Sequence, residues 1–218
     1  MSRTRHSLLD VRVRYAAMAA VCAAALWGCG GANSDTAGTG VSCAADGVCQ
    51  TACAIQGTVA AFDAVAETLA RTTVGSWGPG TRVNVERSLR PSDRLGGHFV
   101  AGHIDAAGRV IENRERPDGW WLRVEAPADL FPEIATKGSI AIDGVSLTVV
   151  EAAPPAFSVA LIPTTLRETT LGALAAGDRV NLETDLLAKY VRRALAAIAG
   201  GQADQRLREA LARSGFID

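Results

Sequence analysis

The chain has 218 residues, of which 48% are hydrophobic and 21% are charged, and its formal net charge is −1 at pH 7. This charge balance excludes a nucleic-acid-binding protein that works through a broad basic surface. No apolar run approaches the ~20 residues that a membrane-spanning helix needs, which excludes an integral membrane protein. The composition is that of a soluble globular protein with one large domain or two compact ones.

Residues 1–41 are the least typical part of the sequence. An arginine-rich start is followed by an apolar run at 16–27 and by small residues around Cys29, the pattern of a bacterial secretory or lipoprotein signal. Asp10 within the basic region and Trp27 close to the cleavage position are unusual for such a signal. Two alternatives stay open: a protein that is exported or lipid-anchored at Cys29, or a degenerate or misread beginning of the first domain.

All five cysteines lie in the first quarter of the chain, at Cys22, Cys29, Cys43, Cys49 and Cys53. An odd number confined to one end is a poor disulfide framework. Cys49 and Cys53 have no second pair of cysteines or histidines nearby at the spacing of a zinc site. We therefore expect reduced thiols in a cytoplasmic protein, and no metal.

From residue 42 onward, short alternating segments rich in β-branched residues and separated by turns predict strands. These segments are 81–86, 120–126, 139–142, 146–150 and 179–183. Only two stretches before the C-terminal tail are predicted to be helical. One is short, at 127–134, and the other is amphipathic, at 186–198, and ends before two glycines.

Three motifs occur twice, each time with the same separation of 97 residues and without a gap. The recurring pairs are Asp46-Gly47-Val48 and Asp143-Gly144-Val145, Thr68-Leu69 and Thr165-Leu166, and Arg82-Val83-Asn84 and Arg179-Val180-Asn181. Such a period is too long for a solenoid repeat. It indicates two copies of one strand-rich domain, for which a small barrel or sandwich is expected.

Each copy has two small polar residues at alternate positions after its Asp-Gly turn. These are Cys49 and Thr51 in the first copy and Ser146 and Thr148 in the second. Alternate residues of a strand share one face, so each copy presents a matched pair of hydrogen-bonding groups. The pairs suit a planar polar heterocycle, and the alternative is that they face solvent on an exposed strand.

Several segments occur in the order and at the spacing found in the riboflavin synthase family, which this sequence therefore resembles. They are Gly96-Gly97-His98, Gly102-His103-Ile104-Asp105, Lys137-Gly138-Ser139, and the stretches 143–149 and 161–166. The resemblance implies an all-β fold of two similar six-stranded antiparallel Greek-key barrels in tandem, followed by a C-terminal helix that holds a trimer together. The implied divisions are an atypical segment 1–41, an N-terminal barrel 42–97, a C-terminal barrel 98–185, and a trimerisation helix with its tail at 186–218.

The N-terminal barrel is expected to be incomplete, because the family's opening Met-Phe-Thr-Gly-Ile-Val strand has no counterpart here. Gln50 also stands where the family has an apolar residue. Three readings of function follow from the resemblance. The first is an active riboflavin synthase, the second a non-catalytic paralogue that binds lumazine or flavin, and the third an inactive fragment with a defective N-terminal barrel.

As a riboflavin synthase, the protein would be a cytoplasmic homotrimer that dismutates two molecules of 6,7-dimethyl-8-ribityllumazine. The products would be riboflavin and 5-amino-6-ribitylaminouracil, and the reaction would need neither cofactor nor metal. The resemblance also implies lumazine synthase as a partner, and neither nucleic acid nor a membrane.

The resemblance implies catalytic roles for His103, Ser146 and Cys49. His103 is the candidate for proton transfer because imidazole titrates near neutral pH, and its alternative role is a structural histidine in a turn flanked by glycine. His98 is expected to shape the segment between the barrels. Lys137 is expected either to pair with a polar ring substituent or to be a solvated surface charge.

The implied substrate-binding residues fall into two sets. The N-terminal set is Cys49, Gln50, Thr51, Asp63, Ala64, Val65, Ala66, Glu67 and Thr68. The set assigned to the C-terminal pocket is Gly102, His103, Ile104, Lys137, Ser146, Leu147, Thr148, Ala160, Leu161, Ile162, Pro163, Thr164 and Thr165.

Overall fold

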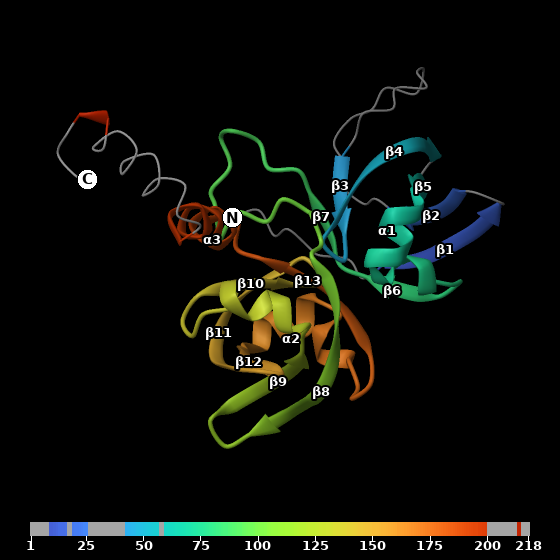
Figure 1. Ribbon diagram of the computed structural model, residues 1–218. Coiled ribbons are helices and arrows are strands. Elements are labelled where there is room, and N and C mark those ends of the chain that lie inside the picture. The colour runs from blue at the N-terminus through green and yellow to red at the C-terminus, as the bar shows by residue number, and fades with distance from the viewer. Residues whose placement is uncertain (1–8, 17–18, 26–41, 57–58, 200–212, 215–218) are drawn as a thin grey trace.

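Two strand-rich units, one for each repeat, make up the protein (Figure 1). The structure is a computed structural model, and it describes residues 9–16, 19–25, 42–56, 59–199 and 213–214. The helix α3 (Leu186–Ala199) lies beside the second unit, and a long segment without regular structure joins the two units (Figure 1). None of the helices within the described residues is both long and apolar enough to span a membrane.

The C-terminal unit is a closed antiparallel barrel, as the family resemblance implies. Its strand order is β10 (Ser139–Ile142), β11 (Val145–Ala153), β12 (Ala156–Leu161), β9 (Gly119–Glu125), β8 (Ala106–Arg116) and β13 (Arg179–Thr184). The alternation of apolar and polar residues explains the closure, because every strand turns an apolar face to one common core. Phe157, Leu122, Ile140 and Leu182 in this core are at most 1% exposed.

The N-terminal unit is a sheet of seven strands with the same neighbour relations. The order is β6 (Thr81–Val83), β1 (Leu9–Ala16), β2 (Ala19–Ala25), β5 (Val59–Ala64), β4 (Val48–Gln56), β3 (Ser42–Ala45) and β7 (Val85–Arg87). Its core gathers around Phe62, Val74 and Trp77.

The beginning of the chain supplies two of these strands. The backbone of β1 pairs with β6, and the backbone of β2 pairs with β5, so these segments occupy the positions that β8 and β9 hold in the other unit. The structure thus differs from the expectation that the first strand of the N-terminal barrel is missing. Cys29, the alternative lipid anchor, lies outside the described residues.

The separation of 97 residues between the repeats holds for the three-dimensional structure. Strands β3, β4 and β5 have the same lengths as β10, β11 and β12 and begin 97 residues earlier. Even an irregularity repeats, because the register shift at Ala52/Ala54 in β4 recurs at Val149/Glu151 in β11. One difference is that β13 corresponds to two short strands, β6 and β7, which are interrupted at Asn84.

Two helices were not expected from the sequence, so the prediction of only two helical stretches is wrong. These are α1 (Ala66–Arg71) and α2 (Pro163–Glu168), followed by the short 3-10 turns η1 (Thr73–Ser76) and η3 (Leu171–Ala173). Six residues are too few to show a helical period, which explains the omission. The predicted helix at 127–134 is a 3-10 turn, η2 (Ala128–Glu133), and the predicted helix at 186–198 is α3.

Candidate active site

The polar pairs that follow the Asp-Gly turns lie on the outer faces of β4 and β11. Cys49 and Thr51 are exposed, as are Ser146 and Thr148. The residues between them, Gln50 and Leu147, are only 7% and 8% exposed, so their side chains face the interior. A ligand on the outer face could touch these two predicted binding residues only through their main chains.

A hollow of about 530 Å³ lies in front of Cys49. It is lined by Val48, Cys49, Glu67, Thr68, Arg71, Thr72, Gly102, His103, Ile104 and Asp105. Six of the predicted binding residues therefore meet around one cavity. Glu67 and Thr68 come from α1, and the histidine comes from the segment that enters the second barrel.

The segment 102–104 docks on the N-terminal unit, which differs from its predicted place in the C-terminal pocket. The Cys49 N–H donates to the Gly102 carbonyl at 3.0 Å. A Cβ atom at Gly102, whose φ is +79°, would lie 2.5 Å from the Cβ of Cys49, so only glycine fits. Ile104 packs against the N-terminal core. The segment lies on the N-terminal unit because the chain runs along the surface of that unit before β8 begins at Ala106.

Ser146 is held instead by an earlier part of the same connection. The His98 Nδ1 lies 2.8 Å from the Ser146 Oγ, and the His98 backbone N–H donates to the same oxygen at 3.3 Å. A Cβ atom at Gly97 would lie 2.5 Å from that oxygen. Burial lowers the pKa of His98, against the opposing effect of the Asp185 and Glu183 carboxylates, which favours a neutral imidazole at this hydrogen bond.

From the sequence, His98 was expected only to shape the segment between the barrels. A signal was present, because Gly97-His98 and Gly102-His103 are the same dipeptide five residues apart. Gly97-His98 contacts Ser146, and Gly102-His103 contacts Cys49, the equivalent strand residue of the first unit. Glu183 in β13 fixes the second dipeptide, since its carboxylate accepts the N–H groups of Ala101 and Gly102 at 2.8 and 3.0 Å.

The remaining predicted residues form matching surfaces beside the two strands. Ala64 and Leu161 are buried, whereas Thr68 and Thr165 are half-buried. The exposed members are Asp63, Val65 and Ala66 in the first repeat and Ala160, Ile162, Pro163 and Thr164 in the second. Lys137 is exposed in a turn with φ +68°, and its side chain forms no hydrogen bond or ion pair with the residues that the structure describes.

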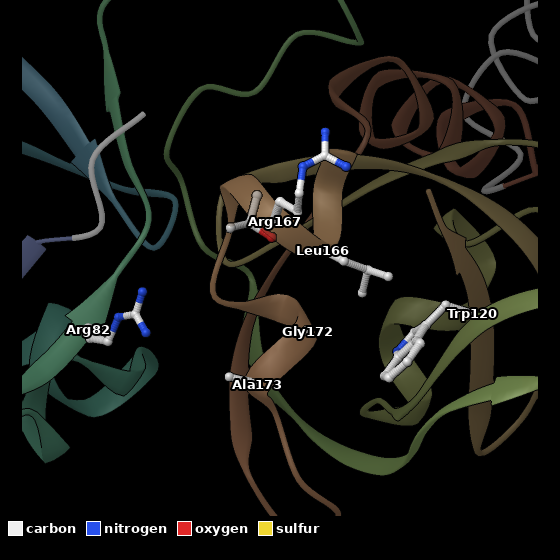
Figure 2. A pocket seen from close by; sticks show the side chains of 7 residues that line it. Arg82, Trp120, Leu166, Arg167, Gly172 and Ala173 are labelled. Atoms are coloured by element: carbon white, nitrogen blue, oxygen red, sulfur yellow. The ribbon is translucent and has the colours of Figure 1, made fainter. Parts of the chain in front are cut away.

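A second hollow, of about 290 Å³, lies between β6 and the α2–η3 segment (Figure 2). Arg82 faces it from the N-terminal unit, and Trp120 and Arg167 face it from the C-terminal unit (Figure 2). None of the predicted binding residues lines it. Within the described part of the chain, no cluster of three or more metal-ligating side chains is present.

Comparisons with known proteins match both repeats of the chain to one family. Residues 26–88 and 101–185 match the lumazine binding domain family. The riboflavin synthase of Mycobacterium tuberculosis is 46% identical over 164 residues, which cover 72% of this chain and 80% of that protein. The riboflavin synthase of Photobacterium phosphoreum is 36% identical over 181 residues, with 82% of both chains covered.

Solved structures with the same fold include two complexes of LumP. The complex with riboflavin has a TM-score of 0.69 at 24% identity and covers 82% of this chain and 96% of LumP. The complex with 6,7-dimethyl-8-(1'-D-ribityl) lumazine has a TM-score of 0.68 at 21% identity and covers 82% of this chain and 95% of LumP.

The duplicated unit, with a polar strand face and a Gly-His dipeptide for each copy, defines a protein with two tandem lumazine-binding domains. Within that class, the sequence identity to the bacterial enzymes and the share of both chains that it covers show the family. The chain belongs to the riboflavin synthase family.

Proposed function

We propose that this chain catalyses the dismutation of two molecules of 6,7-dimethyl-8-ribityllumazine. One molecule transfers a four-carbon unit to the other, so that riboflavin and 5-amino-6-ribitylaminouracil are formed. The observation that carries the proposal is the pairing of two equivalent ligand faces, each with a hydroxyl or thiol group beside a histidine. A reaction between two copies of one substrate needs two such faces, and holding both copies in place lowers the barrier substantially.

His103 is the proposed group for proton transfer at the N-terminal face. It shares the hollow with Cys49 and is exposed, so a ligand in that hollow lies within its reach. On the other face, Ser146 is the counterpart of Cys49, and His98 lies within hydrogen-bonding distance of the Ser146 hydroxyl group. Hydrogen bonds from such groups to the ring edge stabilise charge that develops during the reaction.

We also propose a homotrimer in which α3 makes contacts between subunits. The support is an apolar stripe on this helix, where Leu187, Tyr190, Val191 and Leu195 are 57–66% exposed. Ion pairs hold the opposite side of the helix on its own barrel, from Lys189 to Asp105 and from Arg192 to Glu133.

A cytoplasmic location is supported by the cysteines. Cys49 and Cys53 carry free thiols, as expected in a reducing compartment. Lumazine synthase is the proposed partner, because an enzyme that forms the lumazine must supply the substrate of this one. Cell fractionation and co-purification test these two points.

The test of the function is an assay for riboflavin, whose fluorescence appears as the lumazine is consumed. The unaltered protein should form riboflavin, and His103→Ala should lower the rate about 100-fold or more, the usual contribution of a proton-transfer group. Ser88→Ala is the control, since this exposed hydroxyl only donates to the Ser42 carbonyl and its loss should change the rate less than twofold. Binding of the lumazine without any riboflavin would overturn the proposal.

A further inference from the structure

Two asparagines of the repeated motif, Asn84 and Asn181, have no part in the function proposed above. They occupy equivalent positions, where β6 and β7 are interrupted in the first unit and within β13 in the second. Asn181 is completely buried, and Asn84 is half-buried. Within the described part of the chain, both side chains form hydrogen bonds only with the opposite unit.

Asn181 belongs to the C-terminal barrel, yet it holds the N-terminal site at two points. Its Nδ2 donates to the Asp46 carbonyl at 3.0 Å, and its Oδ1 accepts the Thr73 N–H at 2.8 Å. Asp46 lies in the turn three residues before Cys49. Thr73 follows Thr72, whose hydroxyl donates to the Thr68 carbonyl at 2.6 Å. Both contacts therefore lead directly into the hollow that contains Cys49.

Asn84 makes the reciprocal contacts with the C-terminal site. Its Nδ2 donates to the Asp143 carbonyl at 3.1 Å, and its Oδ1 accepts the Thr170 N–H at 2.8 Å. Asp143 lies three residues before Ser146. The Thr169 hydroxyl, next to Thr170, donates to the Thr165 carbonyl at 2.7 Å, which completes the match with the first site.

Each asparagine is fixed in its own unit by the aspartate of the same repeat. The Asp46 Oδ1 accepts the Asn84 N–H at 2.7 Å, and the Asp143 Oδ1 accepts the Asn181 N–H at 2.7 Å. The two aspartates belong to turns that contact each other closely. A Cβ atom at Gly144 would lie 2.6 Å from the Gly47 nitrogen. The four polar residues thus form one symmetric cluster across the boundary between the units.

We propose that Asn84 and Asn181 are crossed positioning residues: each one holds the ligand site of the other barrel in its binding geometry. The inference rests on the proposed function and deepens it, since it gives each barrel control of the other barrel's site. Buried amide groups that lose their partners are costly, so these bonds hold the turns and helix ends in place.

The test needs a separate probe for each site. Cys49 reports on the N-terminal site, because its alkylation by iodoacetamide can be followed in a peptide map, with Cys53 as an internal standard. Riboflavin should protect Cys49. In Asn181→Ala, Cys49 should react about fivefold faster without ligand, and protection should need about tenfold more riboflavin. In Asn84→Ala, both values should stay within twofold of the unaltered protein.

The imidazole signals of His98 in an NMR spectrum report on the C-terminal site, next to Ser146. Here the pattern should be reversed. Asn84→Ala should raise the riboflavin concentration at which the His98 signals are half shifted about tenfold. Asn181→Ala should leave this concentration unchanged. This reversal is a result that general destabilisation cannot produce.

Asn113→Ala is the matched control. Its side chain forms three hydrogen bonds, to Leu171, Leu174 and Trp120, against two for each of the other asparagines, but all three lie within the C-terminal unit. The variant should leave the reactivity of Cys49 unchanged. If an alanine variant does not fold, Asn181→Ser and Asn84→Ser provide the same comparison with a smaller loss of stability.

Equal effects of Asn84→Ala and Asn181→Ala on both probes, or an effect of each only in its own barrel, would overturn the inference. If riboflavin fails to protect Cys49 in the unaltered protein, the proposed function loses its support. In that case, the alkylation rates measured without ligand still show whether each asparagine positions the site of the opposite unit.

Discussion

The buried carboxyl group of Asp143 has a direct consequence for stability. Burial raises its pKa from 3.8 to about 7, although the hydrogen bond from the Asn181 N–H acts in the opposite direction. Burial also raises the pKa of Asp46, and the charge of Asp143 raises it further. Between pH 4 and pH 7 the folded protein therefore holds protons that the unfolded chain has released.

This difference predicts that the free energy of unfolding falls as the pH rises through that interval. The decrease is up to ~1.4 kcal/mol per pH unit for each extra proton that the folded state holds. Asp143→Asn keeps an oxygen for the Asn181 N–H but cannot titrate, so its stability should depend less on pH. Urea unfolding at pH 5 and pH 7 measures the effect, with the exposed Asp118→Asn as the control. Equal slopes for Asp143→Asn and the unaltered protein would contradict this prediction.

At the level of the elements, the β3–β4 and β10–β11 turns meet through their glycines. Gly47 and Gly144 have φ values of +76° and +79°, and neither has room for a Cβ atom against the other's backbone. Gly144→Ala should therefore lower the free energy of unfolding by about 3 kcal/mol, from backbone strain and overpacking together. Gly80→Ala, with φ +89° and open space around it, should cost only about 1 kcal/mol. A thermal or urea unfolding series that finds equal losses would show that the close contact of the turns contributes nothing.

The elements also show what could be predicted from the sequence. Strands β9, β10, β11 and β13 follow from the alternation of apolar residues, and the repeat gives the equivalents of β10, β11 and β13 in the first unit. The helices α1 and α2 could not be predicted, since each has six residues and no side-chain cap. The first two strands were obscured by an alanine-rich composition that is also typical of a signal sequence.

The sequence predicted which residues belong to the candidate site, but not how they are arranged in space. Cys49 and Ser146 were predicted as site residues because the repeat and the family resemblance both mark them, and His103 was predicted from the resemblance. The sequence could not show that the connecting segment touches both units, so that His98 serves Ser146 and His103 serves Cys49. The hydrogen bonds of Asn84 and Asn181 to the opposite unit were hidden for the same reason, because they join residues 59 to 135 positions apart.

For the whole molecule, the decisive question is how the two ligand faces come together. The two equivalent turns meet back to back at one boundary, and each ligand face has its own Gly-His dipeptide. We propose that in the trimer the N-terminal face of one subunit meets the C-terminal face of its neighbour. Catalysis then depends on assembly, because each substrate molecule is bound by a different chain.

This dependence gives the last prediction. Leu187→Ser combined with Val191→Ser removes two exposed apolar side chains from α3, each of which would contribute roughly 1–3 kcal/mol when buried in a trimer interface. The double variant should sediment as a monomer and form riboflavin at least ~100-fold more slowly, while each barrel still binds riboflavin. Arg193→Ser, an exposed change on the same helix, should remain trimeric and active. Because association depends on concentration, the activity of the double variant should rise as the protein is concentrated. A monomer with full activity would show that both faces of one chain meet in the same molecule.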